Sequence, residues 1–297
     1  MGMLTRNSFP RPDDLTDTSD PTVLYVRSYL LIRTLVGLLG ILLPLLFIVG
    51  EAAYLRGGVH VRGSLSAYYH TSMRDIFVAG LCVTGFLLAT YLSGQARTWD
   101  FWLSLVAGVA VIGVVFFPTT RPGLAPGDPR CGATPEPPGC SPIQQQLGER
   151  LVAGIHFACA VVFILSLAAI AFLFAYRARQ YENNRTVAAV QRTCGWVIIA
   201  AVAGTIVGEL ADVQIWELTP LYLGEVASVW AFGTSWLLQG RALWTRLGRS
   251  RSRASVDPVG PQGSRGAADP RTGEGTTPPG LDPDPAGPHP PDAPPSP

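Results

Sequence analysis

Six long apolar segments constrain this 297-residue chain more than any other feature. A helix needs about 20 residues to cross a hydrocarbon core about 30 Å thick, and about 17 is the lower limit. All six segments reach that limit, and only 14% of the residues are charged, against about 25% in a typical soluble domain. The sequence therefore predicts an all-α protein, a six-transmembrane-helix bundle. The segments are Tyr29–Gly50, Asp75–Gly94, Phe101–Pro118, Leu151–Tyr176, Cys194–Trp216 and Leu221–Gly240.

The two ends of the chain differ in composition from the part between them. Residues 1–26 are polar and rich in Pro and Asp, and residues 244–297 are rich in Pro and Gly. Neither stretch can bury enough apolar surface to offset the entropy lost on ordering. We therefore expect a disordered N-terminal segment over 1–26, a transmembrane domain over 27–243 and a disordered tail over 244–297.

Arginine placement predicts the orientation. Short basic segments stay on the cytoplasmic side of a membrane. Basic clusters lie between the fourth and fifth segments and after the sixth, so both termini are expected in the cytoplasm of a bacterial plasma membrane protein that crosses the bilayer several times. The formal net charge of +1 gives no indication of a nucleic-acid partner; membrane lipids are the expected partners. The clustered arginines are Arg177, Arg179, Arg185, Arg192, Arg241, Arg246, Arg249, Arg251 and Arg253.

Cys131 and Cys140 bracket a Pro-rich stretch in the third loop, which this orientation places outside the cell. An oxidising exterior permits a disulfide there. The alternative is a pair of free thiols.

Polar and ionisable side chains concentrate at the outer ends of the predicted helices. The depth of four of these side chains below the outer ends of their helices, measured at about 1.5 Å per residue, agrees to within about one helical turn. They are His156, Glu209, Asp212 and Glu225. Glu209 and Asp212 are three residues apart and are expected to share a helix face. The sequence predicts a polar pocket open toward the outer leaflet. Its candidate residues are Ser64, Ser66, Tyr69, His70, Arg74, Asp75, His156, Glu209, Asp212 and Glu225.

The residues of this pocket are compatible with three different functions. His70, His156 and Glu209 could bind zinc with a water in the fourth position, since imidazole and carboxylate are zinc ligands. The same side chains could instead form ion pairs that fix helix register, such as Asp75 with Arg74 or Arg62, and Glu209 with His156. The pocket could also bind a lipid headgroup or a small polar ligand without catalysis. A transport path would need polar groups in the inner halves of the helices, which contain almost none that ionise.

Four motifs resemble those of a family of uncharacterised bacterial six-span membrane proteins. They are S-L-S-A-Y-Y-H-T-S-M-R-D-I-F-V from Ser64, F-F-P-T at 116–119, I-H-F at 155–157 and F-G-T-S-W-L-L-Q-G at 232–240. This resemblance implies the six-span architecture and no particular activity.

The layout is also similar, more distantly, to DRAM-like proteins and to the ceramidase/adiponectin-receptor superfamily of membrane hydrolases, which bind zinc through Ser, Asp and His side chains. That second likeness implies metal or catalytic roles for Ser66, His70 and Asp75. The chain departs from it in having six apolar segments rather than seven and no His in the last one. The expected function is therefore a non-catalytic membrane protein with an outer-leaflet pocket, and the alternative is a metal-dependent hydrolase of a lipid amide or ester.

Overall fold

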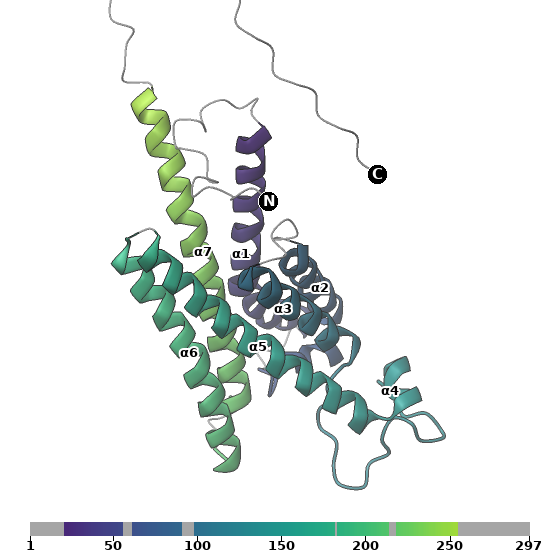
Figure 1. The fold of residues 1–297 in the computed structure, drawn as a ribbon. Helices are drawn as coiled ribbons and strands as arrows, with labels where there is room; N and C mark the ends of the chain where they lie inside the picture. The colour runs from purple at the N-terminus through teal and green to yellow at the C-terminus, as the bar shows by residue number, and fades with distance from the viewer. Residues whose placement is uncertain (1–20, 56–60, 91–97, 182, 214–217, 255–297) are drawn as a thin grey trace, which may run out of the picture. The chain divides into compact units, whose positions relative to one another are not determined.

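The structure is a computed structural model that describes residues 21–55, 61–90, 98–181, 183–213 and 218–254 (Figure 1). The predicted all-α class is confirmed, because this part of the chain consists of helices and connections and contains no β-strand. The elements are α1 (Pro21–Leu55), the 3-10 helix η2 (Ser66–His70), α2 (Arg74–Thr90), α3 (Trp99–Phe116), α4 (Pro142–Leu147), α5 (Glu149–Gln180), α6 (Arg185–Leu210) and α7 (Pro220–Ala254).

The six long helices form a closed ring of neighbours. Each one packs against the long helix before it and the one after it in the chain, and α7 closes the ring by packing along α1. Helix α5 also contacts α7 across the bundle, and the short helix α4 rests on α5. Consecutive packing of this kind is the up-and-down arrangement that short connections favour.

Four helices are long and apolar enough to cross a membrane: residues Ser28–Tyr54 of α1, and all of α3, α5 and α6. Helix α2 has 17 residues, and α7 carries Glu225 among several hydroxyl and glycine residues. The crossing of the bilayer by α2 and α7 therefore remains a prediction.

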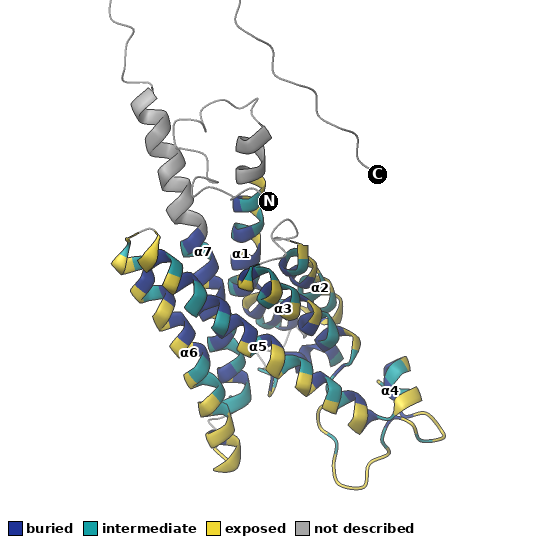
Figure 2. Cartoon of the chain, viewed as in Figure 1, coloured by how far each residue is buried: buried dark blue, intermediate teal, exposed yellow. Residues whose placement is uncertain are grey.

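The outward face of α1 illustrates how the bundle meets its surroundings (Figure 2). Its exposed positions include Leu31, Leu35, Leu38, Leu42 and Leu45, which recur every three or four residues along one face. In a soluble bundle that face would be polar. An apolar exposed face is what a helix presents to lipid.

The centre of the bundle is built around Trp236 of α7, which is fully buried. Its ring packs against Phe174 of α5, with centroids 5.7 Å apart, and against Phe232, at 5.4 Å. Glycines permit a close crossing of α1 and α7: a Cβ added at Gly233 of α7 would lie 2.8 Å from the carbonyl oxygen of Gly37 on α1. Small residues at such crossings are how membrane helices approach one another.

The helix boundaries differ from the predicted segments. Helix α1 begins at Pro21, inside the stretch predicted to be disordered, and proline is favoured in the first turn of a helix. Helix α7 continues to Ala254, eleven residues beyond the predicted limit of the transmembrane domain, since no proline interrupts it. The remainder of the two predicted tails lies outside the described residues.

Helix α6 ends at Leu210, short of the predicted limit at Trp216. Asp212 takes a left-handed conformation with φ 52°, and the amides of Asp212 and Val213 donate to the carbonyls of Glu209 and Gly208. This pair of hydrogen bonds is a Schellman motif, which terminates a helix and satisfies its last carbonyls.

The end of the bundle predicted to face the cytoplasm is more polar than expected. Arg33 of α1 is buried, and its guanidinium lies 4.5 Å from the ring centroid of Tyr29 and 5.0 Å from that of Phe174. Asp100 of α3 is also buried and forms an ion pair with Arg177 of α5. The expectation of nearly no ionisable groups in the inner halves missed Arg33, because a single Arg within a leucine-rich segment barely changes its hydropathy.

Candidate functional site

The segment between α1 and α2 is fixed to the start of α7. Ser64 Oγ accepts a hydrogen bond of 3.1 Å from the amide of Ala67, in the first turn of η2. The same oxygen lies 3.1 Å from Ser66 Oγ. The amide of Leu65 donates to Glu225 Oε2 at 2.6 Å. Three of the predicted pocket residues, Ser64, Ser66 and Glu225, are thereby brought together.

A set of polar side chains gathers beneath this segment; we call it the polar cluster, and it consists of Glu51, Arg62, Tyr68, Tyr222 and Glu225. Glu51, near the end of α1, is 1% exposed and accepts a 2.9 Å hydrogen bond from Arg62 Nε. Tyr68 is fully buried, and its ring stacks on Phe47 with centroids 5.2 Å apart. The cluster therefore joins α1, the first loop and α7.

Three buried atoms of the polar cluster make no hydrogen bond of standard geometry among the described residues: Glu51 Oε2 and the hydroxyls of Tyr68 and Tyr222, although these two hydroxyls are close enough to interact with each other. Burial, together with the nearby Tyr222 and Glu51, raises the pKa of Tyr68 to about 12, and Arg62 acts in the opposite direction. Tyr68 therefore stays protonated and keeps a hydroxyl proton to donate. A buried polar atom without a partner costs about 1–3 kcal/mol, so three of them at one place point to a ligand or to bound water.

Tyr222 is a cluster member that the sequence reasoning missed. It lies three residues before Glu225 on α7, so the two share a helix face. That spacing was the available signal. Tyr68, like Tyr222, was not among the predicted candidate residues of the pocket.

His156 of α5 is 6% exposed, and its side chain donates to backbone carbonyls at the end of α3. Pro118 has no amide proton, so the carbonyl of Val114, four residues earlier, lacks its usual helical partner. His156 Nδ1 replaces that donor, at 3.0 Å from Val114 O and 2.7 Å from Phe117 O. Because a carbonyl can only accept, Nδ1 carries the proton, and only Nε2 could bind a metal.

His70 also binds a backbone carbonyl near the end of α3, two residues after Phe117. Its Nε2 donates to Thr119 O at 2.9 Å, and Gln144 Nε2 of α4 donates to the same oxygen at 2.9 Å. Burial lowers the pKa of His70, and the hydrogen bond to Thr119 opposes that shift. His70 is therefore held as a neutral ring that joins the first loop to the third.

Arg74 and Asp75 begin α2, and Tyr69 lies before it in η2. Arg74 donates to the Tyr69 hydroxyl at 2.9 Å, and its guanidinium lies 4.6 Å from the Tyr69 ring centroid. His70 and Arg74 belong to different elements, because Thr71 is extended and separates η2 from α2. Asp75 is exposed. The expected pairing of Arg62 with Asp75 is replaced by its pairing with Glu51.

Glu209 and Asp212 do not join the other candidates. Both are exposed, and the left-handed Asp212 lies beyond the end of α6, so the two do not share a helix face as predicted. The expected pair of Glu209 with His156 is not among the ion pairs of the described residues, and His156 is instead engaged with backbone carbonyls. No group of three His, Cys, Asp or Glu side chains within the described ranges is close enough to hold a metal ion. The set of His70, His156 and Glu209 is thus not assembled.

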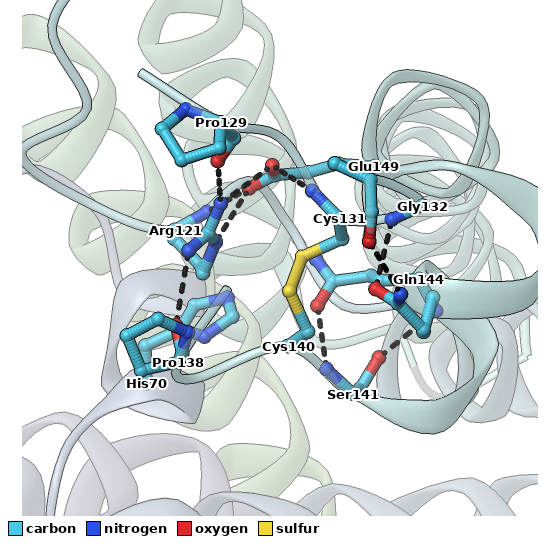
Figure 3. The surroundings of a disulfide bond; sticks show 12 residues. His70, Arg121, Pro129, Cys131, Gly132, Pro138, Cys140, Ser141, Gln144 and Glu149 are labelled. Carbon is cyan, nitrogen blue, oxygen red and sulfur yellow. Dashed lines mark hydrogen bonds and ion pairs between the residues drawn. A yellow bond between two sulfur atoms is a disulfide. The ribbon is translucent and has the colours of Figure 1, made fainter. Parts of the chain in front are cut away.

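The third loop is cross-linked and anchored (Figure 3). Cys131 and Cys140 form the predicted disulfide. Beside it, Glu149 at the start of α5 accepts from the Arg121 amide at 2.9 Å and from the Cys131 amide at 3.2 Å, while the Arg121 guanidinium donates to the carbonyls of Pro129 and Pro138. This anchor was not predicted. The loop is held rigidly next to His70 and Gln144.

These features define a class: an all-helical protein with several helices of membrane-spanning length and apolarity, and a buried polar cluster at one end. Comparison with protein-family models, curated proteins and solved structures finds no match to the chain. Any assignment of function therefore depends on the site itself.

Proposed function

We propose that this is a six-span integral protein of a bacterial plasma membrane, with both termini cytoplasmic, whose polar cluster binds a lipid headgroup or small polar ligand from the outer leaflet. The observation that carries the proposal is the convergence of three buried atoms that lack a hydrogen bond of standard geometry among the described residues, Glu51 Oε2 and the Tyr68 and Tyr222 hydroxyls. They come from α1, the first loop and α7.

The chemistry of the cluster favours a ligand that donates hydrogen bonds. It contains two carboxyl groups and one guanidinium, and that guanidinium is already paired with Glu51. Glu51 Oε2 can only accept a hydrogen bond, and the two tyrosine hydroxyls can accept as well as donate. A ligand bearing hydroxyl or ammonium protons, such as an ethanolamine headgroup, would complete the set.

The test compares phosphatidylethanolamine with phosphatidylcholine, which share the phosphate but differ in N–H donors. We expect native mass spectrometry of the purified full chain in neutral detergent to show a preference for phosphatidylethanolamine of about 5- to 30-fold, equivalent to one or two hydrogen bonds of about 1 kcal/mol. Tyr222→Phe and Glu51→Gln should abolish the preference. Tyr54→Phe, at a tyrosine that is 69% exposed on the same end of α1, is the matched control and should retain it.

Equal binding of the two lipids by the parent protein, or an unchanged preference in both cluster variants, would contradict the proposal. Metal analysis of the same samples addresses the metal-dependent hydrolase. Stoichiometric zinc that is present in the parent and lost in both His70→Ala and His156→Ala would favour the hydrolase.

A further inference from the structure

A second polar feature lies at the opposite ends of α5 and α6 from the third loop and the Schellman turn. An open pocket of about 470 Å³ is formed between the last turns of α5 and the first turns of α6. Three arginines line it, together with two aromatic residues and two alanines. We call it the arginine pocket. Its arginines are Arg179, Arg185 and Arg192.

The three pocket arginines differ from three other arginines of the described residues. Within the described ranges, Arg62, Arg121 and Arg177 each pair with a buried carboxylate, whereas no ion pair involves Arg179, Arg185 or Arg192. Arg177, two residues before Arg179, is committed to Asp100. The loop also contains Glu182, which lies outside the described residues. Three unpaired guanidinium groups around one pocket form a strongly cationic site, suited to bidentate binding of phosphate oxygens.

The pocket has an apolar floor and a charged rim. Phe172 and Ala175 line it one to two turns before Arg179 on α5, and Ala188 lies between Arg185 and Arg192 on α6. At 1.5 Å per residue, Phe172 and Arg179 are separated by about 10 Å along the helix. That length is enough to span a lipid phosphate, the glycerol and the upper part of an acyl chain.

The position of the pocket fits a lipid. Helices α5 and α6 are both long and apolar enough to cross a membrane, and the pocket lies where α5 ends and α6 begins. The proposed topology places this end on the cytoplasmic side. Basic pockets between membrane helices on that side bind the headgroups of anionic lipids.

We infer that the arginine pocket binds the phosphate of an anionic phospholipid, with the guanidinium groups on the phosphate oxygens and Phe172 and Ala175 against the glycerol and upper acyl chain. This site is separate from the polar cluster and does not depend on the function proposed for that cluster.

The test measures binding of phosphatidylglycerol and phosphatidylethanolamine to the full chain in neutral detergent by native mass spectrometry. Both headgroups carry hydrogen-bond donors, so the pair isolates net charge. We expect phosphatidylglycerol to bind at least tenfold more tightly. Each Arg→Gln substitution should weaken its binding about fivefold, and the triple variant on the order of a hundredfold, because each basic residue at a membrane surface contributes about that factor.

The matched control is Arg150→Gln, which removes an exposed arginine from the other end of α5 and should leave binding unchanged. Tyr222→Phe should also leave the phosphatidylglycerol preference intact, which separates this site from the polar cluster. Should the triple variant misfold, Arg185→Gln and Arg192→Gln alone decide the matter, since both positions are exposed.

Unchanged phosphatidylglycerol binding in those two single variants would overturn the inference. A competition with millimolar inorganic phosphate distinguishes the source of the phosphate. Retained lipid binding supports a lipid site, and displacement of the lipid by phosphate at that concentration would overturn the lipid assignment in favour of a soluble anion.

Discussion

At the scale of single residues, Pro118 and His156 show how a buried polar side chain can serve the backbone. Proline ends α3 by removing the donor that Val114 O would use, and in an apolar environment an unpaired carbonyl is costly. The imidazole of His156 supplies the donor from a neighbouring helix. From the sequence alone, a histidine at this depth is equally consistent with a metal ligand and with a hydrogen-bond donor to the backbone. Only the geometry distinguishes them.

This account predicts a specific coupling between the two residues. His156→Ala leaves two carbonyls without their donor and should lower the free energy of unfolding by about 1–3 kcal/mol. In a Pro118→Ala background, residue 118 regains an amide that can donate to Val114 O. The same His156→Ala change should then cost measurably less.

A double-mutant cycle on the thermal or denaturant unfolding of the protein in detergent measures this coupling. An equal cost of His156→Ala in both backgrounds would show that replacing the proline donor is not the role of His156. A variant with the size of imidazole but no donor, His156→Phe, is the packing control and should behave like His156→Ala.

At the scale of elements, the close crossings between helices depend on glycines whose surroundings differ sharply. Gly233 on α7 faces the backbone of α1, and an added Cβ there would meet Gly37 O at 2.8 Å. Gly204 on α6 has no atom within 4 Å of such a Cβ. Of the two glycines in the G-x-x-x-G motif of α6, only Gly208 makes a close contact, against Pro220, while Gly204 does not pack against another helix.

The two glycines form a matched pair for mutation. Gly233→Ala should destabilise the protein by about 1–3 kcal/mol, because the backbone of α1 must move to admit a methyl group. Gly204→Ala should be neutral or stabilise it by up to about 1 kcal/mol, the usual gain in helix propensity. Thermal unfolding of both variants in the same detergent compares them. Similar destabilisation by the two substitutions would contradict the close crossing of α1 and α7.

The helices were the predictable part of this fold, and the contacts between them were not. Each apolar segment overlaps one long helix, since hydropathy over some 20 residues averages out local errors. Glu209 and Asp212 do not share a helix face, because α6 ends at Leu210, six residues before the predicted limit at Trp216, and Asp212 lies beyond that end. The pairing of Glu51 with Arg62, and of Arg121 with Glu149, joins residues 11 and 28 positions apart, and one sequence does not specify which carboxylate each arginine selects.

At the scale of the whole molecule, the two polar features define an asymmetric bundle. The polar cluster and the disulfide-linked loop lie toward one set of helix ends, and the arginine pocket lies toward the other ends of α5 and α6. The disulfide favours an oxidising compartment for its side, and the basic pocket favours the cytoplasm for the opposite side. These two arguments use different chemistry and agree on one orientation.

That orientation predicts which positions an impermeant thiol reagent can reach in intact cells. Cys82, Cys159 and Cys194 are replaced by Ala, while the Cys131–Cys140 disulfide is kept because it is unreactive toward such reagents. A cysteine at Ala125, an exposed position of the third loop, should be labelled before lysis. A cysteine at Tyr181, 78% exposed in the α5–α6 connection, should be labelled only after the membrane is opened.

The two positions control for one another, since each carries a single exposed thiol in the same background. The reverse pattern would invert the topology, place the polar cluster on the cytoplasmic side and move the arginine pocket to the outer leaflet. Labelling of both positions in intact cells would mean that α5 does not cross the bilayer, because Ala125 and Tyr181 lie beyond its opposite ends. The orientation supported by both the disulfide and the arginine pocket predicts a different outcome, in which only the cysteine at position 125 reacts in intact cells.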